Sequence, residues 1–189
     1  AKKFTTEGNT RIESSGAGIG FDKTTSNGQG EIEFKKGSKT FVKGGIAGVF
    51  ARYNKVTFEE GSDTTLIGGA YGLMANKGII KKGAKVTLMG NYGTGKFEVK
   101  EHDRLTFESG SELNILANDS ALYGIRLVGK TKLIAKGYNV LRQIDTYADG
   151  EHSLNTVTFE KGSILDGNID RSWNSQFLLE EGTKLFVPE

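Results

Sequence analysis

Short segments in which apolar and polar residues alternate recur along the chain, and each of them ends in a glycine. The clearest copies are 31–38 (EIEFKKGS), 55–62 (KVTFEEGS), 104–111 (RLTFESGS) and 156–163 (TVTFEKGS). An alternation with a period of two predicts a β-strand with one buried face. The glycine predicts a tight turn, because glycine adopts the positive φ that other residues avoid.

Four weaker copies lie before, between and after the clear ones, at 4–8, 79–83, 133–137 and 178–183. The mean spacing of the turn glycines is about 25 residues, within the range that marks a stacked repeat fold. We therefore expect turns at Gly8, Gly37, Gly61, Gly83, Gly110, Gly137, Gly162 and Gly182.

Each regular period continues with a second short strand, a pair of glycines and a third short strand. In the second and third periods these strands are expected at 40–42 and 49–50, and at 65–67 and 73–74. Three short strands per period and no lasting 3.6-residue periodicity favour an all-β fold, a parallel β-helix (β-solenoid) of about eight short coils. We expect one domain over residues 1–189, with equivalent residues of successive coils stacked about 4.8 Å apart.

Charge and composition narrow the classes of function. The chain has 25 Lys and Arg against 23 Asp and Glu, a net charge of +2, which is too balanced to indicate a nucleic-acid partner. It contains no cysteine. It also has no run of eighteen apolar residues, so the sequence predicts no membrane-spanning helix. Most charges fall at the turns, where we expect them to be solvated.

Residues that would carry catalysis or bind a metal do not form a recognisable group in the sequence. His102 and His152 have no catalytic partner at a known spacing, and the aspartates share no offset that would stack them. The Gly-x-Gly runs open no helix, so they do not predict a phosphate loop. We therefore expect no enzymatic activity, no catalytic residues, no metal site and no cofactor.

About ten residues after each turn glycine lies a second recurring position, which is aromatic from the third coil onward. If the register holds, these residues form one stripe, with Arg126 and Arg171 beside it: Tyr71, Tyr92, Tyr123, Tyr147 and Trp173. Aromatic rings bind the flat faces of sugars, and arginine binds the acidic groups of a glycan. The same spacing also fits a packing ladder that fills the solenoid, and both interpretations remain open.

The repeated VTFEEGS, LTFESGS and VTFEKGS segments, in a glycine-rich chain without cysteine, resemble the pectate-lyase-like β-helical domains of Gram-positive surface adhesins, notably those of lactobacilli. The resemblance covers the whole chain and implies a right-handed parallel β-helix, excised from a longer surface protein. It also implies an extracellular location, with anchoring to the cell wall through regions outside this segment. The implied partners are host epithelial or mucus glycans or a polysaccharide, acidic ones included.

We therefore expect a non-enzymatic, monomeric adhesin domain that binds glycans along the aromatic stripe, with no nucleic-acid partner. One alternative is a lyase or hydrolase of acidic polysaccharides on the same fold, although none of the calcium ligands of such lyases can be matched here. The other alternative is a structural spacer or a self-association module.

Overall fold

The computed structural model is built entirely of β-strands in the part of the chain that it describes. That part comprises residues 2–21, 30–95, 105–108, 110–117, 125–127, 132–136, 155–159, 164–166, 175–179, 181–182 and 184–186. The first ten strands are β1 (Lys3–Thr6), β2 (Asn9–Ser14), β3 (Ala17–Gly20), β4 (Glu31–Phe34), β5 (Lys39–Gly44), β6 (Ala47–Phe58), β7 (Asp63–Gly68), β8 (Tyr71–Ile80), β9 (Lys85–Gly90) and β10 (Tyr92–Gly95). The other eight are β11 (Leu105–Phe107), β12 (Glu112–Ala117), β13 (Ile125–Leu127), β14 (Lys132–Lys136), β15 (Asn155–Phe159), β16 (Ile164–Asp166), β17 (Ser175–Leu179) and β18 (Lys184–Phe186).

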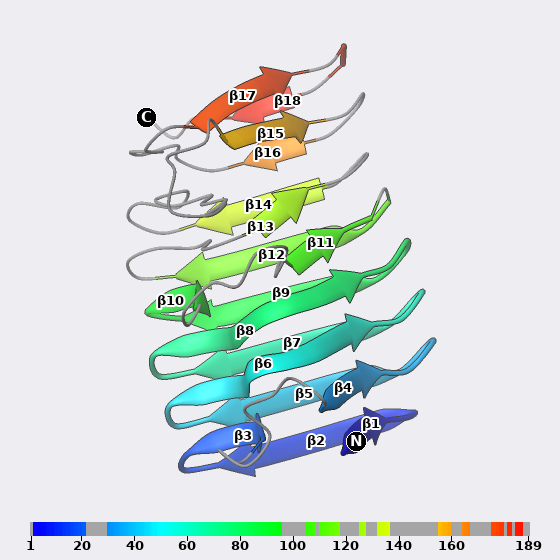
Figure 1. Ribbon diagram of the computed structural model, residues 1–189, viewed down its shortest axis with the longest axis vertical. Coiled ribbons are helices and arrows are strands. Elements are labelled where there is room, and N and C mark those ends of the chain that lie inside the picture. Colours follow the sequence, from blue (N-terminus) through cyan, green and yellow to red (C-terminus); the bar gives the residue numbers. More distant parts are fainter. Residues whose placement is uncertain are drawn as a thin grey trace.

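These strands wind into a parallel β-solenoid, as the repeat predicts (Figure 1). One sheet, which we call the flat sheet, takes one strand from each repeat in the order β2-β5-β7-β9-β12-β14-β16-β18. The other large sheet contains β1, β4, β6, β8, β11 and β13, with β3 paired to β6 and β10 paired to β8. All of the pairings are parallel, so each strand lies beside its equivalent in the next coil.

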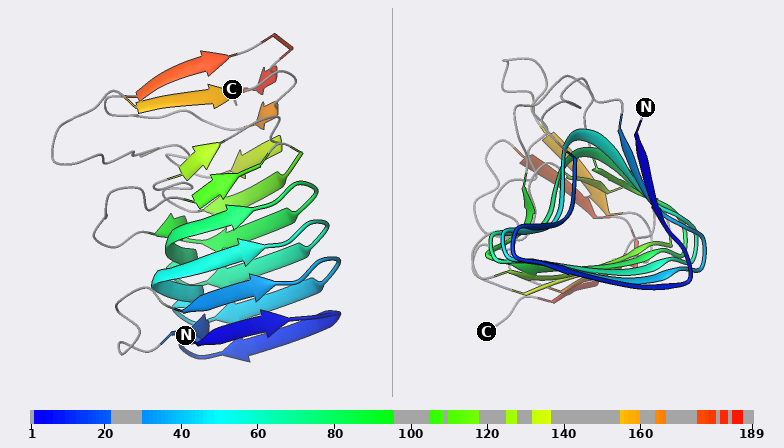
Figure 2. Two further views of the ribbon diagram at one scale, coloured as in Figure 1. Left: turned by 45° about the vertical axis from the view of Figure 1, so that its right-hand side comes forward. Right: turned by 90° about the horizontal axis from the view of Figure 1, so that it is seen from below.

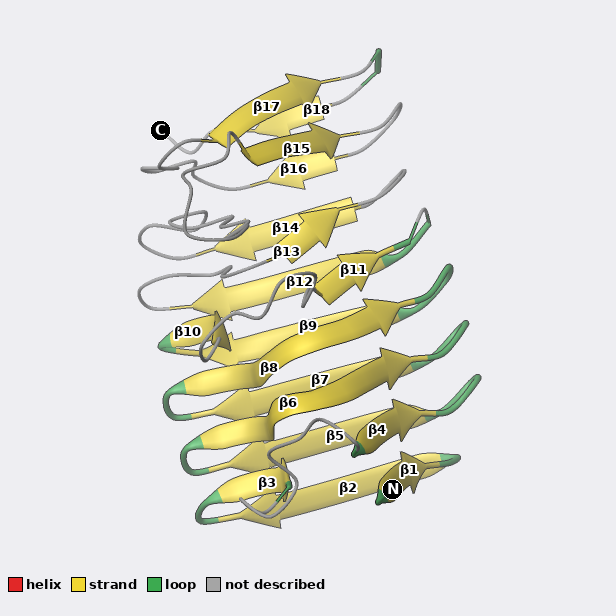
Figure 3. Ribbon diagram, viewed as in Figure 1, coloured by secondary structure: helices red, strands yellow, loops and turns green. Residues whose placement is uncertain are grey.

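Seen along its axis, the solenoid has a roughly triangular cross-section (Figure 2). The flat sheet forms one wall, and the other sheet bends to form the remaining two. The sequence predicted separate third and first strands, but β6 and β8 each run without interruption around the corner between these two walls (Figure 3). The pairing of β6 with β8 shifts register between Phe50 and Lys55, which marks the bend.

The turns that lead into the flat sheet form as predicted. Positive φ angles occur at Gly8, Gly37, Gly61, Gly83, Gly110 and Gly182, between 58° and 79°. The other two predicted turn glycines, at 137 and 162, lie outside the described residues. An added side chain meets nothing within 4 Å at three of the six positions, so the conformation of the backbone, rather than crowding, requires glycine there.

The glycine pairs at the opposite end of the flat sheet are required for a different reason. A Cβ atom on Gly45 would lie 2.0 Å from the carbonyl oxygen of Ser15, and one on Gly69 would lie 2.3 Å from that of Gly45. Each turn therefore rests directly on the backbone of the coil below. Ser15 occupies the equivalent place in the first described coil, where a side chain is accommodated.

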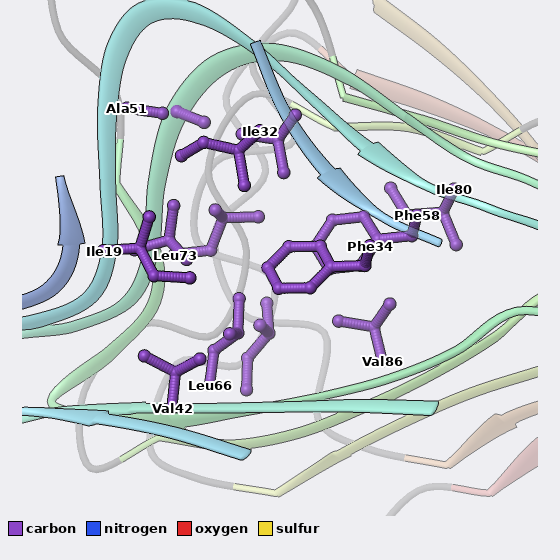
Figure 4. Close-up of a cluster of buried hydrophobic side chains, with 14 of the residues drawn as sticks. Ile19, Ile32, Phe34, Val42, Ala51, Phe58, Leu66, Leu73, Ile80 and Val86 are labelled. Atoms are coloured by element: carbon purple, nitrogen blue, oxygen red, sulfur yellow. The ribbon is translucent and has the colours of Figure 1, made fainter. Parts of the chain in front are cut away.

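The core lies inside the triangle and is filled by equivalent apolar residues of successive coils. Phe34 and Phe58, the phenylalanines of two repeat copies, are fully buried and stack with their ring centroids 4.8 Å apart. Val42 and Leu66 from the flat sheet and Leu73 from the bent wall belong to the same buried cluster (Figure 4). The phenylalanine of the repeat is thus a packing residue, as its alternation predicts.

One of the predicted copies was wrong. The segment 133–137 was expected to precede a turn, but β14 pairs with β12 in the flat sheet, so it follows the turn instead. The strand that precedes the turn in that coil is β13, which pairs with β11. The described part of the chain has no helix long and apolar enough to cross a membrane.

Candidate functional site

The recurring position ten residues after the turn glycine forms a true column in the first four coils. Ala17 pairs with Ala47, Ala47 with Tyr71 and Tyr71 with Tyr92. These residues begin β3, β6, β8 and β10, immediately after the glycine-rich corner. The backbone therefore places Tyr92 directly beside Tyr71 in the next coil, and we call this set the tyrosine column.

The side chain of Tyr71 is half-buried, whereas Ala47 below it is fully buried. The corner is therefore compatible with either a tyrosine or an alanine at this position. Tyr123, Tyr147, Trp173 and Arg171 lie outside the described residues, so the column is followed only from Ala17 to Tyr92. Glycan binding and packing by the stripe both stay predictions for Tyr71.

Arg126 was expected beside the aromatic stripe. Its backbone lies in β13, where it pairs with Thr106, which in turn pairs with Ile79. Ile79 lies eight residues beyond Tyr71 along β8 and past the bend, so Arg126 belongs to a different wall from Tyr71.

The charged residues at the turns are partly solvated, as predicted, and they pair between coils. The Lys81 ammonium donates to both carboxylate oxygens of Glu59 at 2.8 Å, and these hydrogen bonds raise the pKa of Lys81. Lys36 pairs with Glu60 at 3.4 Å. The sequence did not reveal this pairing, because partners in adjacent coils are more than twenty residues apart.

Glu33 is the most buried charged group of this region. Its carboxylate pairs with the Lys3 ammonium, and this contact holds the pKa of Glu33 below its ordinary value. Lys35 and Lys81 contribute more weakly in the same direction. The pair joins the first coil to the second, so its role is in the stack.

The serines that follow the turn glycines Gly37, Gly61 and Gly110 are buried. Ser38, Ser62 and Ser111 place their hydroxyl groups inside the solenoid, without a hydrogen-bond partner among the described residues. The equivalent residue of the fourth coil is Ala84, also buried. The recurring serine is therefore a packing residue and not a nucleophile presented to solvent.

A shallow hollow of about 400 Å³ lies on the outer face of the flat sheet, over three consecutive coils. Its outward-facing residues are Asn9, Arg11, Lys39, Phe41, Asp63 and Thr65. The Arg11 guanidinium lies over the Phe41 ring, 4.4 Å from its centroid. Sequence reasoning missed this place, because Phe41 next to Val42 was taken simply as part of a strand, and only the register shows that it faces outward.

Among the described residues, no group of three or more histidine, aspartate or glutamate side chains could hold a metal ion. Comparison with protein-family models, curated proteins and solved structures found no match to this chain. A function must therefore be inferred from the geometry of the solenoid itself.

Proposed function

We propose that this chain is a non-enzymatic, glycan-binding domain of a bacterial surface adhesin, of the pectate-lyase-like β-helical kind. The glycan lies parallel to the axis of the solenoid, across successive coils at the glycine-rich corner. The ligands of the domain are host surface or mucus glycans or an acidic polysaccharide.

The observation that carries this proposal is the in-register pairing of Tyr92 with Tyr71. Adjacent coils are separated by about 4.8 Å, which is close to the rise of an extended sugar chain. A tyrosine ring offers an apolar surface to a sugar ring and a hydroxyl group for a hydrogen bond. A column of such residues suits a linear ligand better than a compact one.

The glycine pairs support the same location. Because their backbones rest directly on one another, the corner is closely packed, and it fixes the start of β6 and β8. A rigid scaffold lowers the cost of ordering on binding.

The test compares the variants Tyr71→Ala and Tyr71→Ala/Tyr92→Ala with the parent on a panel of neutral and acidic polysaccharides. Ala47 already occupies this column, so both variants are expected to fold. Loss of an aromatic stacking contact of about 1 kcal/mol lowers affinity about fivefold per tyrosine. Phe41→Ala, which removes a half-buried aromatic residue from the flat sheet, is the matched control and is expected to retain glycan binding.

Unchanged binding in the double variant would assign the tyrosine column to packing. Release of unsaturated or reducing ends from any polysaccharide would instead support the enzyme, the alternative function on this fold.

A further inference from the structure

Charges alternate in sign from coil to coil along one edge of the flat sheet. Lys39, Asp63, Lys85 and Glu112 pair in register in that order, and the backbone of Lys132 continues the column. All four described side chains reach the outer face, where they are exposed or half-buried. Lys39, Asp63 and Lys85 make no ion pair with any other residue that the structure describes.

Two further outward-facing columns run beside this one across β5, β7, β9 and β12. The middle column contains Phe41, Thr65, Thr87 and Asn114, all of which are half-buried. The third column begins with the exposed Lys43 on β5 and then brings Ile67 and Met89, both half-buried, side by side on β7 and β9. The face therefore has a column of charges along one edge. Along the other edge, its two middle strands carry apolar residues.

The charges along this column run plus, minus, plus, minus, so the same column read in the opposite direction has the opposite charge at every position. A two-fold axis can lie in this face, parallel to the strands and between β7 and β9. Rotation about it places β5 opposite β12 of a second copy, and β7 opposite its β9. Lys39 then faces Glu112, and Asp63 faces Lys85. The same rotation brings Ile67 opposite Met89, so that the apolar residues meet as well.

We propose that two copies of this chain associate through the outer face of the flat sheet around this axis. An interface with a two-fold axis must be complementary to itself, and this face meets that condition in the charged column and in the central pair of Ile67 and Met89. A two-fold axis along the solenoid instead sets each coil opposite its own copy, with Lys39 facing Lys43, so it brings like charges together. The expected arrangement is two sheets packed face to face, about 10 Å apart.

The size of the face makes the association weak. Four strands spaced about 4.8 Å apart, each six residues long, cover about 400 Å² per copy. A standard interface buries about 800 Å² per partner. The dimer is therefore expected to form at tens to hundreds of micromolar protein and to weaken as salt screens the charge pairs.

A charge swap between two variants tests this arrangement. In Asp63→Lys, the changed residue faces Lys85 of the second copy, and in Lys85→Asp the changed residue faces Asp63. Each variant alone is expected to dimerise at least tenfold more weakly than the parent in sedimentation experiments at low salt. An equimolar mixture is expected to regain the affinity of the parent, because each altered residue then meets an opposite charge. The double variant on one chain is expected to regain it too.

Lys55→Glu, on the other sheet, is the matched charge reversal and is expected to leave dimerisation unchanged. Circular dichroism and thermal melting show whether every variant retains the fold, and the rescue in the mixture separates an effect between copies from one within a copy. A parent that stays monomeric at several hundred micromolar in low salt overturns the proposal. Single variants that dimerise like the parent, or a mixture that does not recover, overturn it as well.

Discussion

The glycine at the corner between the flat sheet and the bent wall provides the sharpest test of how this solenoid is stacked. In Gly69→Ala, the new Cβ atom starts 2.3 Å from the carbonyl oxygen of Gly45 in the coil below. Real Cβ atoms essentially never approach closer than 3.0 Å, so the two coils must separate by about 0.7 Å at this corner.

That separation acts on two hydrogen bonds between the coils. The amides of Ala70 and Tyr71 both donate to the carbonyl oxygen of Ile46, at 2.9 and 3.1 Å. A stretch of this size takes both beyond the normal range of about 3.2 Å, at a cost of about 1 kcal/mol each. Overpacking adds about 1–3 kcal/mol, and the lower entropy of the unfolded alanine variant offsets about 0.5–1 kcal/mol. The free energy of unfolding should fall by about 3 kcal/mol.

For a chain of this size, such a loss lowers the melting temperature by about 6–12 °C, which can be measured by calorimetry or circular dichroism. Gly16→Ala is the matched control, because Gly16 lies at the same corner in the first described coil and its added Cβ meets nothing within 4 Å. Ile46 and Ala70 carry side chains in that same column. The control is expected to melt within about 2 °C of the parent, as a shift below about 0.5 kcal/mol implies. Equal melting of the two variants would refute the steric explanation.

Three further predictions concern stability. Ser62→Ala is expected to leave the free energy of unfolding unchanged within about 0.5 kcal/mol or to raise it, because the hydroxyl has no hydrogen-bond partner in the described part of the chain and Ala84 occupies the equivalent place in the next coil. A loss above about 1 kcal/mol in urea titration would contradict this. Asn54→Ala is expected to lower the free energy of unfolding by about 3 kcal/mol. The Asn54 side chain accepts from the amide of Gly30 at 2.8 Å and donates to the carbonyl oxygen of Ala51 at 2.9 Å, and both groups would be left buried without it. Melting like that of the parent would show that these bonds contribute little. The pKa of Glu33 is lowered by its pairing with the Lys3 ammonium, so the pair stabilises the fold above the ordinary glutamate pKa of about 4.3, and this stabilisation is lost as the pH falls through the lowered value. Denaturant titrations between pH 2 and 7 should therefore show a smaller acid loss in Glu33→Gln than in the parent, and parallel curves would show that the pair is not coupled to folding.

The pattern of the sequence was sufficient to predict the repeat strands that precede the turns at Gly8, Gly37, Gly61, Gly83 and Gly110, and the turns themselves. Val56 and Phe58 alternate with polar residues, and Gly61 follows them, so a strand with one buried face and a left-handed turn can be expected without any tertiary information. These preferences arise from sterics and from burial along a few consecutive residues. The right-handed winding of the coils stays a prediction.

Register was harder to predict from the number of residues after a turn glycine, because the coils differ in length. Ten residues separate Gly20 from Glu31, whereas four separate their partners Phe50 and Lys55. A similar difference occurs in the fourth coil, between β10 and β11. A fixed offset from the turn glycine therefore cannot assign register after such a segment. The next coil is short instead, because Lys132 lies 20 positions after its partner Glu112, whereas Glu112 lies 27 positions after Lys85. This change in coil length is why the copy at 133–137 was assigned to the wrong sheet.

The sequence by itself determined that the chain forms short strands with glycine turns and stacks them in parallel, because each repeat carries one apolar face that only another repeat can cover. Only the tertiary structure decided which residues meet across coils. In the structure, Tyr92 pairs with Tyr71, and the serine of the repeat is buried. Lys39, Asp63 and Lys85 lie in register in a column of alternating charge. These neighbours are twenty or more residues apart, so their contacts depend on the winding of the whole chain.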